Sequence, residues 1–283
     1  MHRIIKLLLL ILFFSVQIKA QHTNLAKANT LYSEEKYSAA QALFQQVILN
    51  ERTKEQAYYY NAKCSKELFA SDAIFLYKQF ITAFPYSSYI QQVNEDLALL
   101  YYRDLDYPKA INYFLKFNSL EQHPDLVFKL AYANFSIDSL VDAQYYFSKL
   151  INTESKYAAT AQYYSAYIAY QNGLYKTALN GFKHLIADEQ FGPIIPYYIT
   201  QILYQQNKYD ELIEYGPLYI DSVTEKRKGE FAKLIGDSYF KKNQYQRSLE
   251  YYQVFKKHAK STRESNYQVG YCYYKTKKYK NTK

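Results

Sequence analysis

The sequence predicts an all-α fold, an α-solenoid of antiparallel helix pairs, from three observations. Small residues recur in two series, each about every 34 to 35 residues along the 283-residue chain. A member of the first series lies twelve residues before a member of the second, so each such pair marks one two-part repeat. Apolar residues in each part have the three- and four-residue spacing of an amphipathic helix. A period of this length is typical of helix pairs that stack mainly on their neighbours.

Each series marks one helix of the repeat. The first-helix small positions are Ala28, Asn61, Ala98, Ala131, Ala166, Thr200, Gly236 and Gly270. The second-helix small positions are Ala40, Ala73, Ala110, Ala143, Ala178, Leu212, Ser248 and Thr282. Two helices approach closely only where a side chain is small, which explains the residue types. We expect seven repeats over residues 22–260 and an incomplete eighth over 261–283.

The first 20 residues predict a secretory signal peptide. Arg3 and Lys6 precede an apolar run from Leu7 to Val16, and the segment ends on Ala20. A membrane anchor is the alternative, but a spanning helix needs roughly 20 apolar residues. We expect cleavage after Ala20, a mature chain with no transmembrane segment, and a location in the periplasm, the cell envelope or the extracellular space.

The fifth repeat shows the expected helix pair most fully. Apolar residues from Tyr163 to Tyr170 have helical spacing, and the helix is expected to stop at Gly173. A second run from Lys176 to Ile186 has one apolar face of its own. The turns between paired helices, such as QNGLY, QQNKY and KKNQY, are polar and end on an aromatic residue.

Aromatic residues occupy fixed places in the second helix. Three residues before the small position lie Tyr37, Tyr107, Tyr175, Tyr209, Tyr245 and Tyr279, with Ala70 and Leu140 as exceptions. Four residues after it lie Phe44, Tyr77, Phe114, Phe147, Phe182 and Tyr252, with Gly216 as the exception. Reuse of one buried place in every repeat explains much of the content of 36 tyrosines and 17 phenylalanines.

This pattern, as in KAINYF and TALNGF, resembles the tetratricopeptide repeat (TPR) over about residues 22–283. With its leader, the chain looks like a secreted or periplasmic bacterial TPR protein. The resemblance implies a right-handed superhelix whose concave groove, lined by the first helices, binds partner peptides or proteins.

Two repeats depart from the pattern at their small positions, the second at Asn61 and the sixth at Thr200 and Leu212. We expect both to pack irregularly. Pro217 follows Gly216 inside the expected second helix of the sixth repeat, and should kink or end it.

The eighth repeat has a first helix, expected over Arg263–Lys275, and the beginning of a second. An uncapped packing surface favours a fragment of a longer protein, with natural termination as the alternative.

Aromatic residues on the first helices are the candidate partner-binding surface. Tyrosine combines a large contact area with a polar tip, which suits recognition. The alternative is that these side chains serve packing alone. The candidates are Tyr102, Phe128, Tyr132, Phe135, Tyr163, Tyr167, Tyr170, Tyr197 and Tyr204. The TPR subclass that grips a carboxylate with lysines and asparagines is not supported, because the matching places are mostly tyrosine.

Positive charge is concentrated near the end of the chain. Residues 224–283 hold 16 Lys and Arg against 5 Asp and Glu. A basic patch steers a protein toward anionic partners, and the alternative is that these side chains lie in solvated turns. The candidates are Lys226, Arg227, Lys228, Lys256, Lys257 and Lys260. Nucleic acid is not expected as a partner of an exported protein.

No pattern for catalysis, a cofactor or a metal is found. The five histidines are scattered, and the two cysteines, Cys64 and Cys272, lie in distant repeats and should not pair. No glycine cluster suits a phosphate. We therefore expect a protein that is not an enzyme and has no cofactor.

The sequence favours a non-enzymatic interaction scaffold of the bacterial envelope. Two alternatives remain open at this point: the extracytoplasmic sensor part of a longer receptor, and the helical module of a cell-wall enzyme. The sequence specifies neither the partner nor the oligomeric state.

Overall fold

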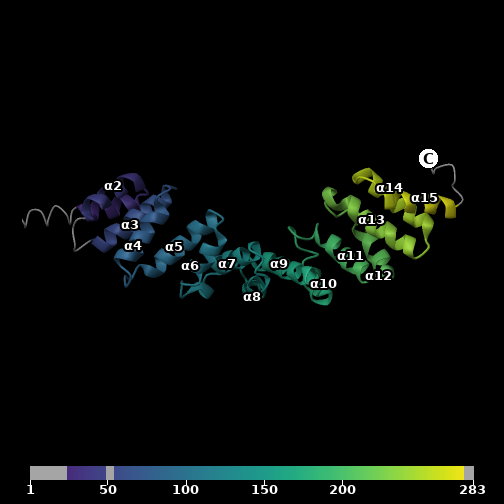
Figure 1. Cartoon of the computed structure of the whole chain (residues 1–283), viewed down its shortest axis with the longest axis horizontal. Coiled ribbons are helices and arrows are strands. Elements are labelled where there is room, and N and C mark those ends of the chain that lie inside the picture. Colours follow the sequence, from purple (N-terminus) through teal and green to yellow (C-terminus); the bar gives the residue numbers. More distant parts are fainter. Residues whose placement is uncertain (1–23, 49–53, 277–283) are drawn as a thin grey trace, which may run out of the picture. The chain divides into compact units, whose positions relative to one another are not determined.

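The computed structural model describes residues 24–48 and 54–276, which contain helices and no strand (Figure 1). Backbone contacts divide the chain into two compact units, Met1–Ser139 and Leu140–Lys283. We call them the N-terminal and C-terminal units and describe each by itself. The expected α-solenoid of helix pairs is confirmed. The expected signal peptide and the second helix of the eighth repeat lie outside the described residues.

The N-terminal unit begins with a helix over residues 24–33. It continues with α2 (Tyr37–Val47), α3 (Lys54–Glu67), α4 (Ala73–Ala83), α5 (Ile90–Arg103), α6 (Tyr107–Phe114), the short 3₁₀ helix η1 (Leu120–Gln122) and α7 (Pro124–Ser136). Packing is between successive helices, with α3 on α2 and α4, and α6 on α5 and α7.

The C-terminal unit contains α8 (Leu140–Ile151), α9 (Ala158–Gln171), α10 (Tyr175–Lys183), α11 (Ile195–Gln205), α12 (Tyr209–Tyr215), the 3₁₀ helix η2 (Gly216–Tyr219), α13 (Glu225–Lys241), α14 (Tyr245–His258) and α15 (Arg263–Lys275). Here α9 packs on α8 and α10, and α13 on α11, α12 and α14. The bounds expected for α15 are confirmed.

Every turn within a repeat is built the same way. A residue with positive φ follows the first helix: Glu35, Phe69, Leu105, Asp138, Gly173, Asn207 and Asn243. The next N–H donates to the carbonyl oxygen five residues earlier, as from Leu174 to Ala169 at 2.8 Å. These are the left-handed residue and the long hydrogen bond of a Schellman C-cap. Carbonyl groups at the end of each first helix therefore find hydrogen-bond donors within the turn itself.

These turns correct the sequence register of the second repeat. In six of the seven turns the left-handed residue comes seven residues after the predicted small position, but Phe69 comes eight after Asn61. The equivalent residue is therefore Ala62, which is fully buried, and the turn to Ala73 is one residue shorter. The second repeat therefore differs from the others in the length of its turn, and its small position is an alanine and not Asn61.

A buried aromatic residue supports the second helix of six repeats, at the position four after the small residue. We call this position the aromatic slot. Phe44, Phe114, Phe147 and Phe182 occupy it and are fully buried. Tyr77 and Tyr252 occupy it in the second and seventh repeats, also buried. The aromatic residue that recurs at this position therefore serves packing, as predicted.

Where the slot holds tyrosine, a buried carboxylate receives its hydroxyl. Tyr77 Oη donates to Asp96 Oδ2 at 2.7 Å, and Tyr252 Oη donates to Asp237 Oδ1 at 2.6 Å. Lys66 pairs with Asp96, and Lys233 lies 2.7 Å from Asp237. Buried polar groups need such partners, so each tyrosine slot carries its own carboxylate and lysine.

In the sixth repeat the second α-helix ends at Tyr215, directly before Gly216 and Pro217, and the chain continues as η2. The predicted interruption is confirmed. Gly216 stands in the aromatic slot, and a Cβ there would lie 2.7 Å from Cγ1 of Ile235 on α13. Ile235 therefore fills the space that an aromatic ring takes elsewhere.

Both cysteines are free and buried. Burial raises the pKa of the Cys64 thiol to about 12, so this thiol stays protonated and unreactive. Each cysteine packs in a hydrophobic cluster, as a small apolar residue does. Within residues 24–48 and 54–276, no helix combines the length and the apolar character that crossing a membrane requires.

Candidate functional site

The first helices of the fifth and sixth repeats bring a group of tyrosines together. Tyr163, Tyr167 and Tyr170 on α9 surround Tyr198 on α11, with ring centroids 6.1, 5.7 and 5.8 Å from it. Tyr197 lies beside Tyr198 at 5.6 Å. We call these five side chains the aromatic cluster. Tyr197 and Tyr198 are buried, and the three tyrosines of α9 are half-buried.

Two phenylalanines support the aromatic cluster. Phe182, in the aromatic slot of α10, stacks on Tyr198 with centroids 5.1 Å apart and planes 10° apart. Phe191 stacks on Tyr163 at 4.8 Å. These stacked contacts hold the tyrosine rings in fixed orientations.

Phe191 comes from the connection between α10 and α11, and local turn chemistry places it. Asp188 Oδ1 accepts hydrogen bonds from the backbone N–H groups of Gln190 and Phe191, both at 2.9 Å. A Cβ at Gly192 would lie 2.6 and 2.7 Å from the carbonyl oxygens of Asp188 and Ile186. The connection can therefore fold back toward α9 only because residue 192 is a glycine.

The hydroxyl groups of the aromatic cluster form a polar network. The Oη atoms of Tyr163 and Tyr198 lie 3.2 Å apart. Tyr197 Oη donates to Glu230 at 2.7 Å and accepts from Gln201 at 2.8 Å. Burial, and then the hydrogen bond to Glu230, raise the pKa of Tyr197 to about 12. The hydroxyl therefore stays neutral at physiological pH and acts as a hydrogen-bond donor.

Arg227 on α13 joins the aromatic cluster from the seventh repeat. Its guanidinium carbon lies 4.3 Å from the ring centroid of Tyr197 and 5.3 Å from that of Tyr198. One nitrogen donates to Tyr198 Oη at 3.4 Å. In the described part of the chain Arg227 forms no ion pair, and the nearby carboxylate of Glu230 accepts a hydrogen bond from Tyr197. The rings therefore orient the guanidinium.

The remaining predicted groove residues lie elsewhere. Tyr204 packs on Tyr209 at 5.6 Å, within the sixth repeat. The other four form a separate group in the N-terminal unit: Tyr102 lies 6.4 Å from Tyr132, which lies 6.4 Å from both Phe128 and Phe135. Five of the nine candidates therefore belong to the C-terminal unit, and four of those five to the aromatic cluster.

The sequence prediction missed Tyr198, Phe191 and the role of Arg227. Tyr198 is next to the predicted Tyr197, and a doubled tyrosine at that place was the available signal. Arg227 reaches the rings because α13 has 17 residues, whereas α11 has 11, and the added turns extend its beginning. No repeat pattern encodes that extension.

The predicted basic patch divides into two groups. Arg227 lies against the aromatic cluster. Lys228 pairs with Asp221 at 3.2 Å and with Glu225 at 3.6 Å. The exposed lysines are Lys226, Lys256, Lys257 and Lys260. Lys256 and Lys257 lie in the last turn of α14, where positive charge complements the helix dipole. A helix-stabilising role therefore accounts for these two.

The described residues contain no group of three or more histidine, cysteine or acidic side chains that could hold a metal ion. The buried carboxylates of Asp96 and Asp237 are each occupied by a tyrosine and a lysine. The chemistry that the aromatic cluster offers is hydrogen bonding, ring stacking and one positive charge.

No protein-family model matches the chain, and no curated protein matches it. Solved structures share its fold. The structure described as Naa15/Naa10 bound to HypK-THB aligns with a TM-score of 0.55 and 17% identity, over 88% of this chain and 39% of that chain. The structure of MamA protein aligns with a TM-score of 0.50 and 16% identity, over 68% of this chain and 97% of that chain. A tetratricopeptide repeat protein from Parabacteroides merdae aligns with a TM-score of 0.48 and 12% identity, over 90% and 99%.

At such identities, the likeness to the first two structures shows the fold alone. The fold of this chain is an α-solenoid of helix pairs.

Proposed function

We propose that the protein is a non-enzymatic interaction scaffold and that the aromatic cluster, with Arg227, binds a segment of a partner protein. The observation that carries this proposal is the oriented guanidinium of Arg227, which lies on two tyrosine rings without a carboxylate partner in the described residues. A half-buried arginine of this kind gains most from a planar anionic group. A partner segment with one acidic side chain among apolar ones fits this surface.

The rings supply the remaining contact area. Tyrosine and arginine are the residue types that dominate binding energy at protein interfaces. The stacks on Phe182 and Phe191 fix the rings before binding, which lowers the entropy cost of association. The structure described as Naa15/Naa10 bound to HypK-THB provides an example of this fold in a complex with other chains.

Substitution of Arg227 tests this proposal. The full chain is used to capture partners from cells that produce it, and the affinity of the recovered partner is then measured for the wild type, Arg227→Ala and Arg227→Lys. We expect a loss of about 10- to 100-fold for alanine, because a charge-assisted hydrogen-bonded contact disappears, and only partial rescue by lysine. Lys226→Ala is the matched control, since this exposed lysine is the preceding residue in the sequence. Equal affinities for Arg227→Ala and Lys226→Ala would contradict the proposal.

We also propose that the scaffold works in the bacterial cell envelope after export. The leader pattern of residues 1–20 supports this location. The intact mass of the protein from a bacterial host, measured after secretion of the full-length precursor, is expected to correspond to a chain beginning at Gln21. A mass that includes residues 1–20 would contradict export by cleavage.

A further inference from the structure

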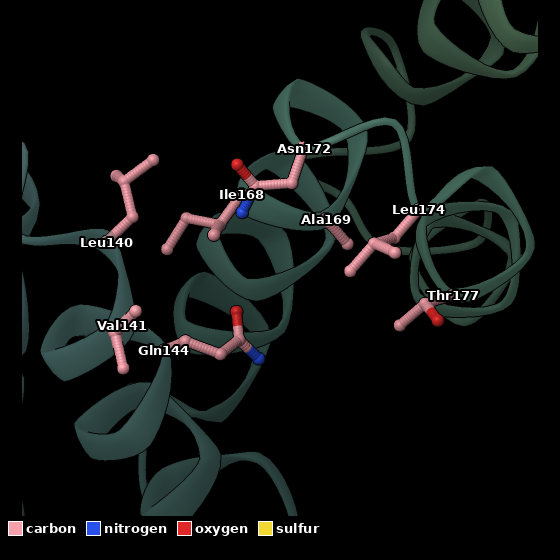
Figure 2. Close-up of a pocket in the computed structure, with 8 residues that line it drawn as sticks. All are labelled: Leu140, Val141, Gln144, Ile168, Ala169, Asn172, Leu174 and Thr177. Carbon is pink, nitrogen blue, oxygen red and sulfur yellow. The ribbon is translucent and has the colours of Figure 1, made fainter.

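A pocket of about 270 Å³ lies between α8, α9 and α10 (Figure 2). Ile168 and Ala169 of α9 form part of its wall, and Val141 and Leu174 stand at its sides. Val141 is 84% exposed and Leu174 is 58% exposed, so apolar surface lies open to solvent around the pocket. None of the lining residues belongs to the aromatic cluster.

The position of Ala169 in the repeat shows that the pocket lacks an aromatic side chain that two other repeats have. Ala169 lies three residues after the first-helix small position, where the third and seventh repeats have Tyr101 and Tyr239. Both of these tyrosines are buried. Tyr101 stacks on Tyr113 at 5.6 Å, and Tyr239 stacks on Tyr251 at 5.5 Å. The third and seventh repeats therefore fill this position with an internal pair of tyrosines.

In the fifth repeat the two positions that hold this tyrosine pair elsewhere have small residues, and the first of them is Ala169. The residue equivalent to Tyr113 and Tyr251 is Gly181. A Cβ at Gly181 would lie 2.7 Å from Gln162 Nε2 and 2.8 Å from Ala166 Cβ, so α10 lies against α9. Position 181, which lies outside the pocket lining, could therefore hold an aromatic ring only if α10 moved away from α9.

A third residue follows the same correspondence. Lys109 lies over the ring of Tyr101 at 5.4 Å, and Arg247 lies over that of Tyr239 at 5.7 Å. Their equivalent in the fifth repeat is Thr177, which lines the pocket (Figure 2). Ala169 and Thr177 thus mark the pocket as the place that an aromatic ring takes in two other repeats.

We propose that this pocket receives an aromatic side chain, of the tyrosine type, from a partner protein. The volume is slightly below the roughly 300–1,000 Å³ of small-molecule sites, so it suits one side chain rather than a larger ligand. The wall is largely apolar. Its polar groups are the amide of Asn172, the hydroxyl of Thr177 and the side-chain oxygen of Gln144, which has no hydrogen-bond partner among the described residues and can accept from a ring hydroxyl. This surface is distinct from the aromatic cluster and extends the proposed function to a second contact.

Nuclear magnetic resonance of the full chain with labelled methyl groups tests the proposal. The probe is N-acetyl-tyrosinamide, and the matched control probe is N-acetyl-leucinamide. We expect the tyrosine probe to shift the methyl signals of Ile168, Ala169 and Leu174 upfield, because a ring in the pocket lies over them. The leucine probe should give no ring-current shift and bind about tenfold more weakly.

Two variants identify the site. Ala169→Tyr places in the pocket the residue that the third and seventh repeats have, and should abolish the shifts at Ile168. Leu174→Glu changes an exposed residue, so the fold is retained, and should weaken binding of the tyrosine probe about tenfold. Tyr86→Ala, at a residue that is 99% exposed, should leave binding of the probe unchanged. The probe is measured without a partner, so loss of probe binding and loss of partner binding at the aromatic cluster are distinguishable.

Three results would overturn the proposal. The first is that both probes shift the methyl signals equally. The second is that Leu174→Glu binds the tyrosine probe as tightly as the wild type does. The third is a shift of the same methyl groups with protein concentration and no probe, because a second copy of the chain would then occupy the pocket.

Discussion

Replacing Phe182 by alanine is expected to lower the free energy of unfolding of the C-terminal unit by about 3–5 kcal/mol, the usual cost of removing a buried phenylalanine. Phe182 is fully buried in the aromatic slot of the fifth repeat. It also stacks on Tyr198, which the three tyrosines of α9 surround. The substitution therefore leaves a cavity and also removes one of the two phenylalanines that support the aromatic cluster.

Chemical denaturation followed by circular dichroism measures this loss. Tyr86→Ala is the control, because this aromatic side chain is 99% exposed, and its effect should stay within about 0.5 kcal/mol. We also expect Phe182→Ala to weaken partner binding, since Tyr198 loses its stacked neighbour. A loss of stability no larger than that of Tyr86→Ala would show that the aromatic slot does not support the repeat.

Replacing Asp237 by alanine is expected to cost about 3–5 kcal/mol, since it removes one partner of a buried charged network. The carboxylate of Asp237 is 3% exposed and lies 2.7 Å from Lys233 Nζ. It also accepts the hydroxyl of Tyr252 at 2.6 Å. Burial, and then the charge of Asp237, raise the pKa of Tyr252, so its hydroxyl stays protonated and needs an acceptor. Alanine would leave that hydroxyl buried and unpaired.

A second substitution shows whether the unpaired hydroxyl causes the loss. In the double variant Asp237→Leu with Tyr252→Phe, both polar groups are gone, and Lys233, which is 26% exposed, can reach water. Replacing both partners of a buried hydrogen bond by apolar groups is nearly neutral, so most of the stability should return. If the double variant unfolds at the same denaturant concentration as Asp237→Ala, the loss comes from packing and the network contributes little.

The sequence predicted the helix pairs because two helices can approach closely only where a side chain is small, and these small positions recur. Ala40, Ala110, Ala143 and Ala178 are all fully buried where two helices meet. Pro217 was equally informative, since a residue without a backbone N–H in the second helix ends it, and α12 stops at Tyr215. The register failed at Asn61, because the shortened turn of the second repeat moves the small position to Ala62, and spacing alone does not show where a turn loses one residue.

A tyrosine in the aromatic slot also predicts that a buried hydrogen-bond acceptor lies next to it. A tyrosine at a place that otherwise holds phenylalanine brings a hydroxyl into the core, and a buried hydroxyl needs an acceptor. Tyr77 and Tyr252 thus require acceptors such as Asp96 and Asp237, which the structure places against them. The repeat spacing does not show which residues these acceptors are.

The candidate site was only partly predictable. The tyrosines of α9 follow the repeat, whereas Phe191 depends on the irregular connection before α11 and Arg227 on the extended beginning of α13. Both features lie outside the repeat pattern. The repeat period therefore identified the tyrosine surface, but it did not identify the positive charge of Arg227 or the ring of Phe191 that supports Tyr163.

Photo-crosslinking at position 167 tests the central claim most directly, because it captures a partner of any identity in place. A photoreactive phenylalanine analogue replaces Tyr167 in cells that produce the full chain, and the same analogue replaces exposed Tyr86 as the control. We predict a discrete covalent adduct from position 167 that is lost when Arg227 is also changed to alanine, and no such adduct from position 86. The absence of an adduct at position 167, or the same adduct at both positions, would contradict the assignment of the aromatic cluster as a partner-binding surface.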